Sequence, residues 1–219
     1  MKIAILGTGR VGQTLAGKFV QLGHEVTMGS RDAANPKAVQ WAASAGGSAR
    51  ADSFSGAAQG AEVILNATAG TASLQALQSA GSANLDGKVL IDVANPLDFS
   101  AGFPPSLSVV NTDSLAETIQ RVFPAARVVK TLNTMTADLM VNPQLVAGGD
   151  HDVFVAGDDG DAKAVVVGLL GELGWEAGHI RDLGGLDAAR ALEMYLPLWL
   201  RLMMTFDQSG RFNIRIVSA

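Results

Sequence analysis

The chain has 219 residues, a formal net charge of −5 and no cysteine, so disulfides, thiolate catalysis and cysteine-ligated metals are excluded. Its basic residues are dispersed along the sequence, which disfavours nucleic acid and an anionic membrane surface as partners. The 48% hydrophobic content allows a sizeable core in one or two domains, and the lack of cysteine fits a cytoplasmic protein.

The first predicted element is a short apolar strand, residues 2–6, which leads directly into the pattern G-x-G-x-x-G. The first glycine permits a tight turn, the second leaves room for a pyrophosphate, and the third lets the next helix pack closely on the strand. That helix begins near Arg10 and offers unpaired N–H groups to a phosphate. The alternative is a glycine-rich turn that holds no ligand. We predict a dinucleotide site built from Gly7, Thr8, Gly9, Arg10, Val11 and Gly12.

The second predicted strand, residues 24–28, completes a βαβ unit and determines the choice of cofactor. A pocket for NAD carries an acidic residue about 20 residues after the glycines, where it binds the ribose hydroxyls. Ser30 and Arg31 stand there instead, and a hydroxyl with a guanidinium suits a phosphate. Lys37 adds a second positive charge. We therefore predict NADP, although a solvated turn in which Asp32 neutralises Arg31 is the alternative.

Strands and helices alternate through the rest of the chain. Further strands are predicted at residues 62–67, 88–93, 127–132, 152–157 and 175–180, with helices at 36–45, 72–80, 115–122 and 161–173. Nearly continuous apolar strands between helices predict an α/β fold with a doubly wound parallel sheet, the Rossmann fold that binds NAD(P). We expect an NADP-binding domain at residues 1–150 and a small C-terminal α/β domain at 151–219 for the substrate and for dimerisation.

The last long segment, residues 186–206, is predicted to be a helix that is apolar on nearly every side. Such a helix is buried, either in the core or against another subunit. Its charged residues and Pro197 exclude a membrane span. We predict a homodimer, with a helix wholly enclosed in the monomer as the alternative. Residues 212–217 follow as an alternating strand or an extended tail.

Small, uncharged residues follow three of the predicted strands, at the edge where open parallel sheets bind ligands. The alternative is that they only cap helices and form turns. The residues expected at the nicotinamide half of the cofactor are Ala67, Thr68, Asn95 and Pro96, and those expected to face a second substrate are Asn133, Thr134 and Met135. The three histidines are scattered, so no metal site is predicted, and no catalytic acid–base pair stands out.

These motifs resemble the NADPH-dependent coenzyme F420 reductase family along almost the full length of the chain. The resemblance rests on K-I-A-I-L-G-T-G-R-V-G at the start, D-V-A-N-P-L, V-V-K-T-L-N-T-M and the late G-G-L-D-A-A-R-A-L-E. It implies a Rossmann domain, a small C-terminal domain, and hydride transfer between NADPH and an 8-hydroxy-5-deazaflavin. It also implies that Thr8, Ser30 and Arg31 bind the 2′-phosphate of NADP and its neighbouring groups.

We therefore expect an NADP-dependent oxidoreductase that exchanges a hydride between NADPH and coenzyme F420 or a related small-molecule acceptor. In such a reaction the protein positions the two cofactors, and the cofactors themselves carry out the chemistry. The alternatives are reduction of a flavin, a ferric acceptor or a small imine or carbonyl compound, and a non-catalytic NADP-binding redox sensor. Imine reduction needs a proton donor, for which Thr134, Tyr195 or water is available.

Overall fold

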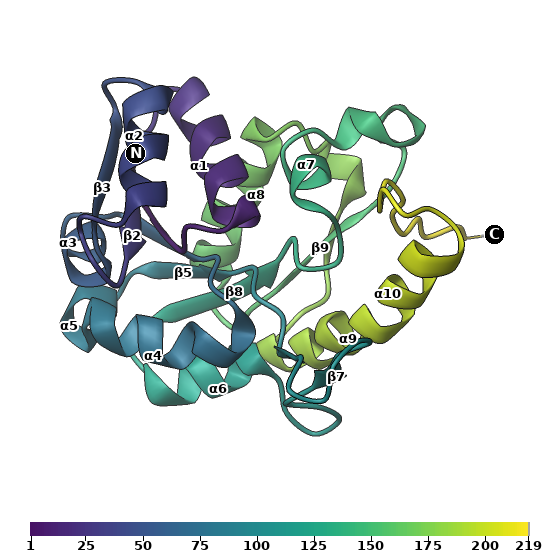
Figure 1. The fold of residues 1–219 in the computed structure, drawn as a ribbon. Helices are drawn as coiled ribbons and strands as arrows, with labels where there is room; N and C mark the ends of the chain where they lie inside the picture. The colour runs from purple at the N-terminus through teal and green to yellow at the C-terminus, as the bar shows by residue number, and fades with distance from the viewer. Residues whose placement is uncertain (219) are drawn as a thin grey trace.

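An eight-stranded sheet with helices on both faces forms the centre of the computed structural model, which describes residues 1–218 (Figure 1). The order of the strands is β10-β9-β8-β5-β4-β1-β2-β3. The first six in the chain are β1 (Lys2–Leu6), β2 (Glu25–Ser30), β3 (Ala49–Ser53), β4 (Val63–Asn66), β5 (Val89–Asp92) and β8 (Arg127–Thr131), and all of them are parallel. Their order is that of a Rossmann fold, which confirms the predicted fold class.

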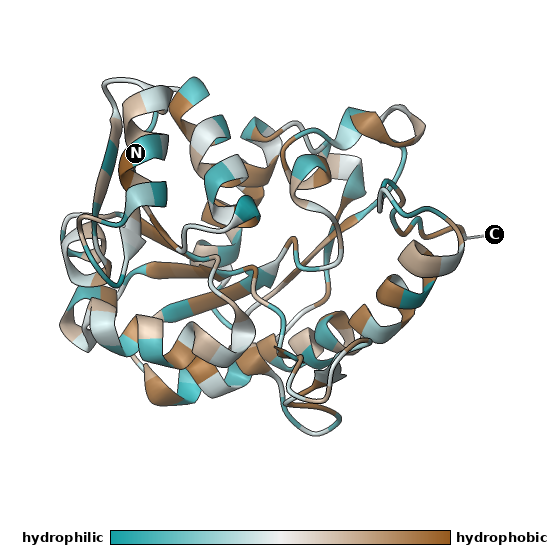
Figure 2. Ribbon diagram, in the orientation of Figure 1, coloured by the Kyte–Doolittle hydropathy of each residue, from teal (hydrophilic) through white to brown (hydrophobic). Residues whose placement is uncertain are grey.

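Both faces of the sheet are buried at its centre, because the central strands are mostly apolar on both sides. In β1, Ile3 and Ile5 belong to one buried cluster and Ala4 and Leu6 to the other. The first cluster lies under α1 (Arg10–Gln21), α2 (Pro36–Ala45), α7 (Ala137–Met140) and α8 (Gly160–Glu172). The second lies under α3 (Phe54–Gln59), α4 (Gly70–Ala80), α5 (Ser82–Leu85) and α6 (Leu115–Val122). Figure 2 shows the hydrophobic strands between these two layers.

The sheet continues beyond β8 with two strands that run in the opposite direction. β9 (Val153–Ala156) pairs antiparallel with β8, and β10 (Ile180–Asp182) then pairs parallel with β9. Between β8 and β9 the chain forms only α7 and two 3₁₀ turns, Pro143–Leu145 and Ala147–Gly149. These short elements do not return the chain to the starting edge of the sheet, so β9 begins near the edge where β8 ends. The parallel arrangement predicted from the sequence therefore holds for six strands, and β9 and β10 run opposite to them.

The predicted strand at residues 175–180 is wrong. The chain instead forms a 3₁₀ turn at Ala177–His179 and only then enters β10. Trp175 lies in the core, where its indole Nε1 donates a hydrogen bond to the Met140 carbonyl at 3.1 Å. Its hydrophobicity reflects burial and not a strand. The strand β3 and the helices α3, α5 and α7 were not predicted.

The predicted helix at residues 186–206 is divided. A 3₁₀ turn at Leu186–Ala188 leads into α9 (Ala189–Met194), and α10 (Leu196–Thr205) follows after Tyr195. Pro197 lies in the first turn of α10, where its missing N–H is tolerated, and it cannot continue the hydrogen bonding of α9. α9 packs on α6, whereas α10 extends away from the sheet (Figure 1).

The chain ends in an extended tail, which was one of the two predicted forms. The tail crosses the start of β9, where the Asp152 N–H donates to the Ile214 carbonyl at 2.9 Å. A two-stranded hairpin of β6 (Leu97–Asp98) and β7 (Ser106–Leu107) lies outside the main sheet. Within residues 1–218, every helix is too short or too polar to cross a membrane.

Candidate active site

The glycine turn after β1 contains two glycines that the protein itself needs and one that it does not. Gly7 has a φ of +123°, and a Cβ there would lie 2.5 Å from the Ala67 carbonyl oxygen. A Cβ at Gly12 would lie 2.2 Å from the Gly7 carbonyl oxygen. A Cβ at Gly9 would meet nothing within 4 Å. The turn and the helix packing therefore require Gly7 and Gly12, whereas the bare backbone at Gly9 faces space that a ligand can fill.

Two helices begin beside this turn without a side chain that caps them. The N-cap residues of α1 and α4 are Gly9 and Ala69, and neither makes a side-chain cap hydrogen bond within the described chain. Side chains do cap α2, α6 and α8, through Asn35, Ser114 and Asp159. The first N–H groups of α1 and α4 thus remain available, and the helix dipoles add positive potential there. Both features favour a bound phosphate.

A cavity of about 360 Å³ lies next to these helix starts. Apart from Phe54, the side chains around it are small or polar, and Arg31 is the one that carries a charge. Arg31 has no ion-pair partner among residues 1–218. The Asp32 carboxylate instead accepts a hydrogen bond from the Ala34 N–H at 2.9 Å, within its own turn. A free guanidinium with no carboxylate on the cavity wall favours a phosphate over a ribose diol.

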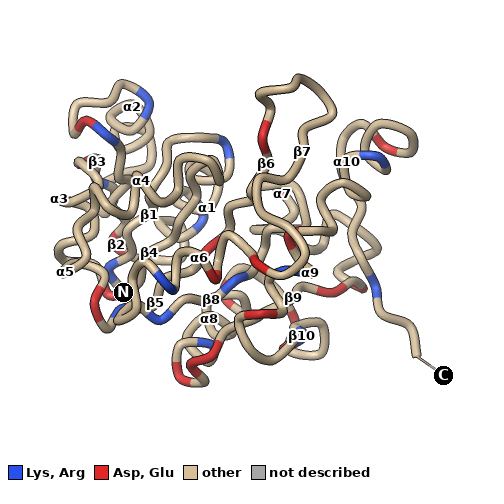
Figure 3. The backbone as a smooth tube through the Cα atoms, turned by 90° about the horizontal axis from the view of Figure 1, so that it is seen from below, with Lys and Arg blue, Asp and Glu red and all other residues tan. Residues whose placement is uncertain are grey.

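Most of the predicted cofactor residues meet at this cavity. The predicted residues that line it are Gly7, Thr8, Gly9, Ser30, Arg31, Ala67 and Thr68. Lys37 lies on the exposed first turn of α2 and does not line the cavity. Arg10 points to α7, where its guanidinium is 2.7 Å from the Asp138 carboxylate. The basic residues elsewhere are spread over the molecule, without a single basic face (Figure 3).

A second cavity, of about 340 Å³, adjoins the first. Both are lined by Ala67, Thr68 and Ala69, so they form two parts of one crevice. The other walls of the second cavity are Val11, Gly70, Thr71, Val93, Ala94, Asn95, Leu97, Asp98 and Phe99. The crevice lies at the carboxyl ends of β1, β4 and β5, where the strand order reverses, which is the usual ligand site of this fold.

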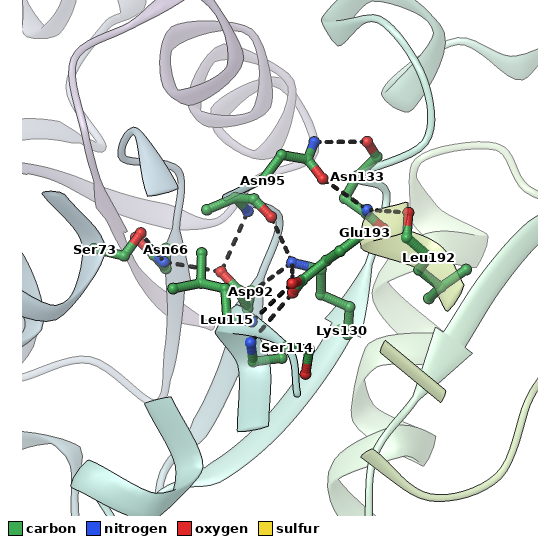
Figure 4. Close-up of polar contacts among 12 residues, drawn as sticks. Asn66, Ser73, Asp92, Asn95, Ser114, Leu115, Lys130, Asn133, Leu192 and Glu193 are labelled. Carbon is green, nitrogen blue, oxygen red and sulfur yellow. Dashed lines mark hydrogen bonds and ion pairs between the residues drawn. The ribbon is translucent and has the colours of Figure 1, made fainter. Parts of the chain in front are cut away.

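Asn95 and Asn133 bind each other behind the second cavity (Figure 4). The Asn95 Nδ2 donates to the Asn133 carbonyl at 2.9 Å, and the Asn133 Nδ2 donates to the Asn95 Oδ1 at 2.8 Å and to the Leu192 carbonyl at 3.0 Å. Asn133, Thr134 and Met135 are buried and line neither cavity. In this structure these three residues therefore support the wall of the crevice, and their contact with a second substrate stays a prediction. Pro96 is also buried.

A buried group of three charged residues, the ion cluster, was not predicted from the sequence. The Lys130 Nζ lies 2.8 Å from the Asp92 Oδ2 and 2.9 Å from the Glu193 Oε1, and it also donates to the Ala94 carbonyl. The side chains of Lys130 and Asp92 are 0% exposed and that of Glu193 is 1% exposed. The sequence signal was a charged residue inside each of two apolar strands, in V-L-I-D and R-V-V-K-T.

The two carboxylates of the ion cluster stabilise the charge of Lys130. Burial by itself would lower the pKa of Lys130, but Asp92 and Glu193 together raise it above its usual value. Burial raises the pKa of Glu193 against the opposing effect of Lys130. The Glu193 carboxylate also accepts hydrogen bonds from the first N–H groups of α6, at 2.7 and 3.2 Å. The ion cluster thus links β5, β8, α6 and α9 directly behind the crevice.

The strand order, the open glycine turn and the uncapped helices define a dinucleotide-binding protein of the Rossmann class. Residues 2–96 match the model of a family described as NADP oxidoreductase, coenzyme F420-dependent. The F420-dependent NADP reductase of Methanothermobacter marburgensis is 34% identical over 215 residues, which cover 92% of each chain. The chain belongs to this F420-dependent NADP reductase family of oxidoreductases, which confirms the family and the enzyme class expected from its sequence.

Two further proteins are similar to this chain. A crystal structure from Arthrobacter sp. FB24, provisionally assigned as an F420-dependent NADP reductase, is 52% identical over the whole of both chains, with a TM-score of 0.93. Metalloreductase STEAP3 of Rattus norvegicus is 31% identical over 205 residues. That match covers 90% of this chain and 38% of the rat protein, so the likeness is to one part of a larger molecule.

The two kinds of glycine in the turn lead to a testable difference. We expect Gly9→Val to fold as the parent chain does and to lose NADPH binding, because the new side chain fills ligand space only. Gly12→Val meets the Gly7 carbonyl and should lower the free energy of unfolding by about 1–3 kcal/mol or more. Thermal unfolding and titration calorimetry measure both effects. Normal NADPH binding by a folded Gly9→Val variant would show that the turn is structural only.

Proposed function

We propose that this protein transfers a hydride between NADPH and the deazaflavin coenzyme F420. The observation that carries the proposal is the single crevice with two cavities that share Ala67, Thr68 and Ala69. One cavity has the unpaired Arg31 for the phosphate end of a cofactor, and the other has walls without bulky side chains except Phe99. Such a crevice allows two flat rings to meet. The membership of the F420-dependent NADP reductase family supports this choice of second substrate.

Each part of the crevice has a distinct task in this proposal. The Gly7–Gly9 turn and the start of α1 bind the pyrophosphate, and Ser30 with Arg31 binds the 2′-phosphate. Ala67, Thr68 and Asn95 hold the nicotinamide half against the second cavity. When bound, NADPH supplies the hydride, and the reduced acceptor takes its proton from water. The protein aligns the rings and keeps water out of the hydride path, so the hydride step needs no catalytic acid or base.

The proposed reaction is tested by mixing the purified protein with NADPH and oxidised coenzyme F420. We expect NADPH-dependent loss of the F420 absorbance, faster than with a flavin, a ferric chelate or a cyclic imine as acceptor. The Gly9→Val variant is the matched blank, because it keeps the fold and loses the cofactor site. Reduction of one of the other acceptors with no reduction of F420 would contradict the second substrate and leave the enzyme class intact.

The preference for NADPH depends on Arg31 in this proposal. We expect Arg31→Ala to weaken NADPH binding by about 1.5–3 kcal/mol, the value of a hydrogen bond to a charged group, with no change for NADH. Arg50→Ala removes an equal charge from the exposed strand β3, outside the crevice, and should change neither affinity. Calorimetric titrations with both nucleotides give the ratio of the NADPH affinity to the NADH affinity. A ratio in Arg31→Ala equal to that of the parent would refute this role.

We also propose that the C-terminal residues 151–219 form a homodimer through α10. Apolar side chains remain exposed on this helix: Leu198 is 55% exposed and Phe206, just after it, is 79% exposed. Phe103, between β6 and β7, is 57% exposed, and the prolines that follow it share a cavity with α10. Figure 2 shows the hydrophobic segments along α10. A second copy of the chain would cover this apolar surface, which is costly to leave in water.

Sedimentation at micromolar concentration measures the proposed association. We expect the parent chain to sediment as a dimer and Leu198→Asp to sediment as a monomer, because a carboxylate cannot be buried in an apolar interface without a partner. Val39→Asp places the same charge on an exposed apolar position of α2. Because α2 packs on β2 and β3 at one edge of the sheet, far from α10 (Figure 1), this variant should leave the dimer intact. A parent protein of 22.6 kDa at all concentrations contradicts the dimer.

A further inference from the structure

The ammonium group of Lys130 has every donor engaged. An ammonium has three N–H donors, and this one faces three acceptors: the Asp92 carboxylate, the Glu193 carboxylate and the Ala94 carbonyl. The Asp92 carboxylate is itself held from the other side, where its Oδ1 accepts from the Asn66 Nδ2 at 2.8 Å. The position of the ammonium group, and therefore of the Ala94 carbonyl, is fixed by charged groups that cannot turn to water (Figure 4).

The Ala94 carbonyl belongs to the segment that forms one wall of the second cavity. We call residues 93–96 the shelf, because Val93, Ala94 and Asn95 line that cavity. Further contacts hold the rest of the shelf. The Val93 N–H donates to the Asn66 carbonyl at 3.2 Å, the Ala94 N–H donates to the Asp92 Oδ1 at 3.2 Å, and the Pro96 carbonyl accepts from the Ser108 N–H at 2.8 Å. A Cβ at Gly70 would lie 2.0 Å from the Asn95 carbonyl oxygen, so α4 touches the shelf backbone directly. The hydrogen bonds between the Asn95 and Asn133 amides hold the side chain of Asn95.

Lys130 sets the peptide plane between Ala94 and Asn95, which these other contacts do not hold. The Ala94 carbonyl points to the ammonium, and in a trans peptide the following N–H points the opposite way. The Asn95 N–H therefore points away from Lys130, and no protein acceptor binds it among residues 1–218. Rotation of this peptide would move both the Asn95 side chain and its free N–H relative to the cavity.

We propose, building on the proposed hydride transfer, that Lys130 is a positioning residue that holds the shelf in the geometry required by the nicotinamide half of NADP. Glu193 sets the position of Lys130 and makes α9 part of that support. Lys130 is not catalytic, because its side chain is fully buried and lines neither cavity. The cofactor half that carries the hydride is thus aligned by an ion cluster that it does not touch.

A purely structural role for the ion cluster predicts a different result, and a second ion pair provides the control. Arg190, also on α9, binds Glu117 of α6 through its Nε at 2.9 Å, and neither residue contacts the shelf. Loss of this pair loosens the attachment of α9 to α6 without any direct effect on Ala94. Arg190→Met therefore reports what a structural change of α9 alone does.

The experiment compares two ligands. Adenosine 2′,5′-bisphosphate carries the adenine half and the phosphate of the 2′ position, and NADP⁺ adds the nicotinamide half. Calorimetry gives both affinities for the parent and for Lys130→Arg, Glu193→Gln, Arg190→Met and the double variant Lys130→Met/Glu193→Gln. The double variant keeps the net charge of the ion cluster and removes the donor to Ala94 without leaving an unpaired buried ammonium; Asp92 loses its cation and keeps the hydrogen bond from Asn66. Primary isotope effects with C4-deuterated NADPH report the hydride step.

We expect the three cluster variants to bind the bisphosphate as the parent does and NADP⁺ about tenfold more weakly, the scale of one lost hydrogen bond. The isotope effect should rise, and kcat should fall with little change in the KM for the acceptor. Arg190→Met should lower the midpoint of thermal unfolding and leave both affinities and the isotope effect unchanged.

Two results would overturn the inference. Cluster variants that keep the parent's affinity for NADP⁺ and its isotope effect would show that the ion cluster only stabilises the fold. If Arg190→Met weakens NADP⁺ binding as much as the cluster variants do, those variants act only by loosening the attachment of α9 to α6. If Lys130→Arg or the double variant does not fold, Glu193→Gln decides the matter, because it preserves the shape of the side chain. A parent chain that binds neither ligand contradicts the proposed function itself, which the variants do not test.

Discussion

Direct contact between backbones at the ends of β1, β4 and β5 determines the shape of the site. Gly7 meets the Ala67 carbonyl, Gly12 meets the Gly7 carbonyl, and Gly70 meets the Asn95 carbonyl, each at a distance that no side chain permits. Because these strands and helix starts approach so closely, α1 and α4 begin next to each other. Their first N–H groups are uncapped by side chains and lie at the same crevice. Both cavities, and the route between them, depend on these three approaches.

The ion cluster fixes the relative positions of helices and strands in a core that is otherwise held by apolar packing. Hydrophobic burial provides most of the stabilisation of such a fold, but it does not specify where one helix lies along another. Lys130, Asp92 and Glu193 do specify it, since removal of Lys130 would leave two carboxylates buried without their cation, and breaking a buried ion pair destabilises a protein by about 3–5 kcal/mol. The position of α9 relative to β5 and β8 is therefore set by charge.

The sequence predicts the parts of this molecule that are encoded locally. The glycine turn, five of the six parallel strands and the residues around Arg31 follow from patterns that span a few positions. β3 was missed because Ala49–Ser53 is a half-exposed edge strand with no apolar run. The direction of β9 depends on the connection that precedes it, and the break before α10 had a visible signal in Pro197. The ion cluster could not be assembled, because Glu193 comes from a helix far along the chain from Lys130.

The turn after β2 is held almost entirely by its own residues. The Ser30 hydroxyl donates to the Asp32 carbonyl, Asp32 binds the Ala34 N–H, and the Asn35 side chain caps α2. None of these bonds reaches the ion cluster or the glycine approaches. The loop is therefore a modular part of the crevice, whose residues can be exchanged while the glycine approaches and the ion cluster keep their contacts.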